Sequence, residues 1–152
     1  MDSQRKRIEA FLQLATEELG VATGLVEEAP RQCAYLLQQA AEKMARAILT
    51  AAEVQFGPGH NLGQMAGVLP EDHPWTEKIR SLNKHSPAAT RYRYPTAEGE
   101  LLEPPSTRRL AQDVRELTNL LEEARQFLGR DRAVLDPRER LRSASTVTSG
   151  SA

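Results

Sequence analysis

Apolar residues recur along this chain at helical spacing. Between residues 3 and 28 they fall at steps of three and four, which gathers them on one helix face: Ile8, Phe11, Leu12, Ala15, Leu19, Ala22 and Val26. Residues 31–56 carry a second stripe and consist mostly of strong helix formers. Small side chains there, such as Ala40 and Ala41, let neighbouring helices approach closely. We therefore expect two long helices, with the second at the centre of the core.

A Gly-Pro-Gly turn at residues 57–59 separates the second helix from a broken third arm. Two short helices are predicted in this arm, over residues 62–69 and 74–84. Asn61 can cap the exposed amides of the first, and Pro74 suits the first position of the other. The third arm is thus expected in two pieces.

The final third of the chain predicts a long loop followed by one more helix. Residues 86–105 contain four prolines and show no helical period. The last helix is predicted over residues 106–128, and Gly129 is expected to end it. The expected fold class is therefore all-α, an antiparallel up-and-down bundle of four to five helices over residues 3–128. Residues 129–152 are polar, and we expect them to form a disordered tail.

Composition mainly excludes classes of protein. A chain of 152 residues with 39% hydrophobic content can bury the core of one domain. Cys33 is the sole cysteine, so a cysteine-built zinc site is excluded, and we expect neither metal nor cofactor. The sequence has no apolar run of membrane-spanning or signal-peptide length, which predicts a cytoplasmic protein of prokaryotic type with no membrane contact. The net charge of -1 requires any polyanion site to be local.

One local concentration of positive charge occurs between residues 78 and 97, which we call the basic segment. It contains five basic residues and no acidic one: Lys78, Arg80, Lys84, Arg91 and Arg93. Tyr92 and Tyr94 alternate with the last two arginines, so this segment pairs groups that attract phosphate with rings that stack on bases. In an extended chain the arginines would face one side and the tyrosines the other. Alternatively, the tyrosines hold the loop on the bundle or on a second subunit, and the arginines face solvent.

Four short motifs are informative in combination. They are CAY at residues 33–35, LQQAAEK at 37–43, HNL at 60–62 and RYP at 93–95. Together they make residues 8–128 resemble the HEPN family of small all-helical prokaryotic domains. The resemblance implies a helical bundle that commonly forms homodimers. Many members of that family are ribonucleases, often toxins of toxin-antitoxin pairs, with an Arg-x4-6-His motif at a dimer interface; others partner minimal nucleotidyltransferases or bind nucleotides without cleavage.

Arg80 and His85 provide one Arg-x4-His spacing in this chain. Histidine can transfer a proton at a ribose 2′-hydroxyl while arginine stabilises the charged phosphate, so the pair is the candidate for metal-independent RNA cleavage. The match departs from the family pattern, because Ser81 follows the arginine and the motif precedes the last helix. No histidine follows the arginines of that helix. The alternative is a solvated helix end, where basic residues complement the helix dipole.

The sequence therefore predicts a domain that binds RNA or a nucleotide, with ribonuclease or toxin activity as its catalytic version. The predicted binding residues are Lys84, Arg91, Tyr92, Arg93, Tyr94 and His60. His60 contacts the ligand or, alternatively, ties its loop by a hydrogen bond. The polar residues of the second helix form an exposed face or frame a cleft, and we expect the exposed face: Gln38, Gln39, Glu42, Lys43 and Arg46. The alternative function is a non-catalytic module that dimerises or partners a nucleotidyltransferase.

Overall fold

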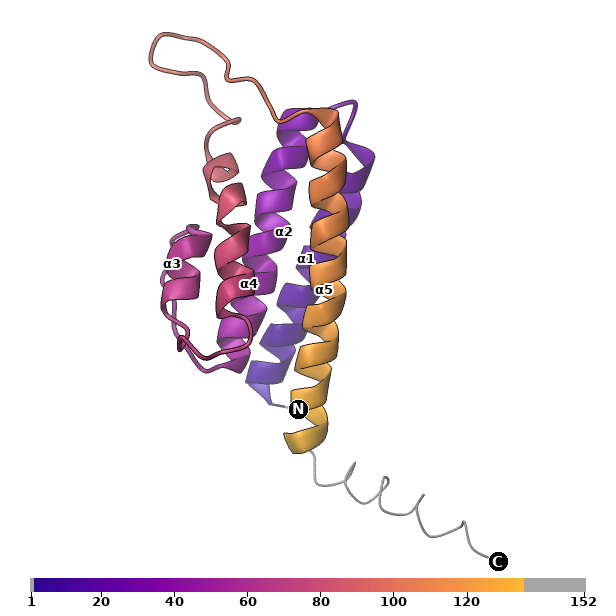
Figure 1. Ribbon diagram of the computed structural model, residues 1–152, viewed down its shortest axis with the longest axis vertical. Helices are drawn as coiled ribbons and strands as arrows, with labels where there is room; N and C mark the ends of the chain where they lie inside the picture. Colours follow the sequence, from indigo (N-terminus) through magenta and orange to yellow (C-terminus); the bar gives the residue numbers. More distant parts are fainter. Residues whose placement is uncertain (1, 136–152) are drawn as a thin grey trace, which may run out of the picture.

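The structure, a computed structural model, describes residues 2–135, and all its regular elements within that range are helices (Figure 1). This confirms the predicted all-α bundle. In chain order the elements are α1 (Ser3–Gly24), α2 (Pro30–Ala51), α3 (Leu62–Gly67), α4 (Thr76–Ser81), the 3-10 helix η1 (Leu82–Ala89) and α5 (Thr107–Leu135).

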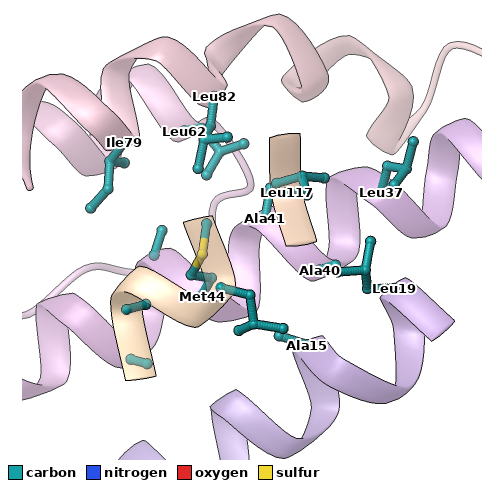
Figure 2. Packing of buried hydrophobic residues seen from close by; sticks show 14 of the residues in the cluster. Ala15, Leu19, Leu37, Ala40, Ala41, Met44, Leu62, Ile79, Leu82 and Leu117 are labelled. Atoms are coloured by element: carbon teal, nitrogen blue, oxygen red, sulfur yellow. The ribbon is translucent and has the colours of Figure 1, made fainter. Parts of the chain in front are cut away.

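The successive arms of the bundle alternate in direction, and α2 lies at the centre. In Figure 1, α1, α2 and α5 run side by side, and the third arm formed by α3, α4 and η1 packs on another side of α2. The buried stripe of α2 includes Leu37, Ala41 and Met44, each at most 2% exposed. Figure 2 shows side chains of α1 and α5, such as Leu19 and Leu117, meeting this stripe. Each large apolar side chain buried in this way stabilises the fold by about 1.5–3 kcal/mol.

Local hydrogen bonds define where the helices begin. The Asp2 carboxylate accepts a hydrogen bond from the amide of Gln4 at 3.2 Å, which caps α1. The Asn61 side chain accepts one from the amide of Gln64 at 2.9 Å, and this confirms the predicted cap of α3. Pro30 occupies the first position of α2. A backbone N–H there would make no intrahelical hydrogen bond, so proline costs the helix none.

Two predicted boundaries near the long loop are wrong. The short helix expected over residues 74–84 is α4 followed directly by η1, which continues to Ala89 and includes Pro87, so the loop begins at Thr90. At the other end, α5 continues past Gly129 to Leu135 because an isolated glycine costs a helix about 1 kcal/mol and does not stop it. The rest of the predicted tail, residues 136–152, lies outside the described residues.

Candidate functional site

A pocket of about 320 Å³ opens where η1, the two ends of the long loop and the first turns of α5 meet. This volume falls at the lower end of the range for small-molecule sites. The apolar part of its wall comes from α2, η1, the loop and α5: Ala34, Leu37, Pro87, Ala88, Tyr92, Pro104, Pro105 and Leu110. The polar part consists of six side chains: Lys84, His85, Arg91, Glu103, Arg109 and Asp113. Three cations from three separate segments thus share one pocket with two carboxylates and an imidazole.

Asp113 of α5 holds two of these cations. Its side chain is 7% exposed, accepts a hydrogen bond from Lys84 Nζ at 3.1 Å and lies 4.0 Å from Arg109 Nε. Lys84 also donates to Glu116 at 2.6 Å. Burial by itself lowers the pKa of Lys84, but the hydrogen bonds to Glu116 and Asp113 outweigh it and raise the pKa. Lys84 is therefore a firmly charged group that links η1 to α5.

His85 is buried in the wall of the pocket. The residue is 6% exposed, and its Nε2 has no hydrogen-bond partner among the described residues. Burial lowers the pKa of His85 to about 4, although the negative charge of Asp113 acts in the opposite direction and raises that pKa. The imidazole is therefore neutral at physiological pH, and the alternative of a solvated helix end is wrong for this residue.

Arg80 is placed differently from His85. It lies in α4 with an exposed side chain that pairs with Glu77 and lies 3.5 Å from Glu71. It is not part of the pocket wall, whereas His85 is. Within this single chain, the structure does not bring Arg80 and His85 together at the pocket.

The basic segment carries less free charge than its sequence suggests. Acidic groups outside the segment contact its first three cations, as Glu123 does for Lys78 at 2.6 Å. Arg91 and Arg93, in contrast, have no carboxylate within ion-pair distance in the described part of the chain. Within the basic segment, the free positive charge is therefore concentrated at the start of the long loop.

The loop does not begin as an extended chain, so the predicted alternation of arginines and tyrosines is wrong. The amide of Arg91 donates to the Pro87 carbonyl at 2.9 Å, which continues the turn of η1. Tyr92 is partly buried against the core and lines the pocket, whereas Tyr94 is 62% exposed. The guanidinium of Arg93 lies over the ring of Tyr35, 4.7 Å from its centroid. One tyrosine thus fixes the loop to the bundle, and the other is left accessible.

His60 ties its loop to α2, as the second interpretation of this residue predicted. Its Nδ1 lies 2.9 Å from a carboxylate oxygen of Glu42, and its ring is 60% exposed. Arg46 donates to the same carboxylate and to the Gly59 carbonyl at 2.8 Å. His60 is not among the residues of the pocket wall.

The polar face of α2 is not the exposed face that we expected. Gln38 is 0% exposed and Glu42 is 5% exposed, because the third arm packs against this helix. Burial raises the pKa of Glu42, but hydrogen bonds from His60, Gln38 and Arg46 together lower it. These polar residues form a satisfied internal network instead of a solvated surface.

Three residues near the candidate site were not predicted from the sequence: Arg109, Asp113 and Tyr35. Asp113 had a detectable signal, because it is a charged residue at the apolar spacing of Leu110 and Leu117 in the last helix. Tyr35 lay within a family motif, but nothing in the sequence placed it near Arg93. Arg109 had no such signal, because it lines the pocket only through the tertiary fold, which brings the first turns of α5 near η1.

Comparison with known proteins identifies a family. The family model of the HEPN domain matches residues 8–131, which is most of the chain and confirms the resemblance based on the four motifs. Searches of curated proteins and of solved structures gave no significant match. Within residues 2–135, no helix is both long and apolar enough to cross a membrane. The described residues also contain no cluster of three or more potential metal ligands.

Proposed function

The chain belongs to the HEPN domain family, and we propose that its pocket binds the phosphate group of a nucleotide or of RNA. The observation that carries this proposal is the pocket wall itself, to which Lys84, Arg91 and Arg109 contribute positive charge from three segments. Arg91 matters most, because among the described residues no carboxylate competes for its guanidinium. Guanidinium groups form paired, charge-assisted hydrogen bonds with phosphate oxygens.

The other groups of the pocket suit the remainder of a nucleotide. The ring of Tyr92 and the prolines at residues 104–105 provide an apolar wall for a sugar or base. The carboxylate of Glu103 and the imidazole of His85 provide polar contacts for hydroxyl or amino groups. This mixture favours a ligand with one anionic end over a purely anionic ligand.

Calorimetric titration with AMP and with a short RNA tests the proposal. Arg91→Ala and Arg109→Ala should each weaken binding by about 10- to 100-fold, since each removes charged hydrogen bonds worth about 1.5–3 kcal/mol. Arg108→Ala is the matched control, because Arg108 is an exposed neighbour of Arg109 outside the pocket wall. An equal loss in Arg108→Ala would indicate unspecific charge attraction and contradict the proposed site.

Ribonuclease activity is a second proposal, supported by His85, which lines the pocket and whose buried Nε2 has no hydrogen-bond partner among the described residues. A neutral imidazole can accept the proton of a ribose 2′-hydroxyl. Because Arg80 lies outside the pocket, catalysis by this pair requires Arg80 of a second copy, as in a homodimer. RNA incubated with the protein and excess chelator should be cleaved, and His85→Gln and Arg80→Ala should each lose this activity. Restored cleavage on mixing the two variants would support a shared site; intact RNA throughout would oppose it.

These titrations also test the non-catalytic alternative, in which the same surface contacts a nucleotidyltransferase. A surface reserved for a protein partner predicts no measurable binding of AMP or RNA by the isolated chain. A toxin, in contrast, would both bind and cleave RNA. The two binding results therefore decide between the protein-partner and nucleotide-binding proposals.

A further inference from the structure

Next to the pocket, Arg93 of the loop is held between two tyrosine rings. Its guanidinium carbon lies 4.7 Å from the ring centroid of Tyr35 and 5.6 Å from that of Tyr94. Tyr35 belongs to α2 and is partly buried, so it provides a fixed support for the stack. Tyr94 is 62% exposed and therefore offers an accessible ring. We call these three residues the stacking platform.

The chemistry of the stacking platform suits a nucleobase. Arg93 has no carboxylate partner among the described residues, so its charge is free to attract a phosphate, while the exposed ring of Tyr94 is free to stack on a base. Proteins that bind single strands combine such cations with aromatic rings, because every base has a face that can stack. An exposed ring fixed beside an unpaired guanidinium supplies both parts.

The platform also lies within reach of the pocket. Arg91 lines the pocket, and Tyr94 follows it by three residues, so their backbones are separated by at most about 10 Å. Successive bases of a stacked strand rise by about 3.4 Å each. A strand with one phosphate in the pocket can therefore place a neighbouring base on the platform.

We propose that Tyr35, Arg93 and Tyr94 bind a base of a single-stranded polynucleotide whose neighbouring phosphate occupies the pocket. This inference rests on the proposed function and sharpens it: the ligand is an oligonucleotide strand, and a mononucleotide fills half of the site. A duplex is excluded as the preferred ligand, because its bases are stacked on one another and paired.

Binding of AMP and of the tetranucleotide A4 by the same variants tests the platform. The wild type should bind A4 at least about tenfold more tightly than AMP, because loss of one base–aromatic stack typically costs that much or more. Tyr94→Ala should weaken A4 binding by about tenfold and AMP binding by less than about twofold. Tyr94→Phe keeps the ring and should retain wild-type affinity for A4. Because Tyr94 is exposed, both variants should keep the wild-type circular dichroism spectrum and melting temperature.

The outcomes separate failure of the platform from failure of the proposed function. If AMP and A4 both bind but Tyr94→Ala changes neither, the platform is refuted and the pocket stands. If the wild type binds neither ligand, the proposed function itself fails. Comparing the affinities for an RNA and a DNA tetramer shows whether the site prefers ribose or deoxyribose. Selective binding of either single strand supports the platform. A duplex or an acidic peptide that binds as tightly as A4 would overturn it.

Discussion

His85 lies beside the Asp113 carboxylate, yet burial lowers the pKa of its imidazole from 6.5 to about 4. The unfolded chain therefore binds this proton more readily than the folded chain. The contribution of neutral His85 to the free energy of unfolding is fully present above about pH 6.5, and it is lost as the pH falls towards 4. Over that interval, His85 should account for a fall of about 3 kcal/mol in the free energy of unfolding.

Urea unfolding at about pH 7 and at about pH 4 measures this effect of His85. In the His85→Gln variant the side chain does not titrate, so the difference in unfolding free energy between the two pH values should be smaller by about 3 kcal/mol. Carboxylates whose lowered pKa does not depend on His85, such as Glu42, affect both proteins equally and cancel in the comparison. Equal pH dependence in the two proteins would show that His85 is not buried as a neutral group.

At the scale of an element, α5 differs most from its prediction because it continues through Gly129. A Cβ atom added at Gly129 would meet nothing within 4 Å, so Gly129→Ala should stabilise the protein by about 0.5–1 kcal/mol through its higher helix propensity. Gly99 is the matched control, because its φ of 80° disfavours an alanine, and Gly99→Ala should destabilise by about 1 kcal/mol. Urea unfolding of both variants measures whether each substitution raises or lowers the free energy of unfolding. A destabilising Gly129→Ala would mean that the helix ends at this residue.

At the scale of the whole molecule, the bundle was predictable and the pocket was not. Apolar residues such as Leu37 and Met44 of α2 recur with the period of a helix, so the elements and their buried faces follow from local spacing. The pocket depends instead on contacts between η1, the loop and α5, as in the hydrogen bond from Lys84 to Asp113. These two residues are 29 positions apart, and no local sequence pattern predicts a contact over that separation.

The basic segment illustrates the same limit. Its sequence predicted Arg91 and Tyr92 as binding residues, and the structure places both in the pocket wall. It also suggested five free cations, whereas Lys84 is engaged by α5 and Arg80 by acidic neighbours. Which charges remain free is decided by the tertiary fold, which brings acidic side chains of other elements next to the segment.

Nucleotide binding in the pocket between η1 and α5 can be followed by NMR of the three histidines during titration with AMP and with A4. His85 lines the pocket, whereas His60 is bound to Glu42 outside the pocket wall and His73 lies against Phe127. Binding in the pocket predicts a saturable shift of the His85 ring signals, with those of His60 and His73 nearly unchanged. Saturable shifts at His60 or His73 with His85 unmoved would contradict it.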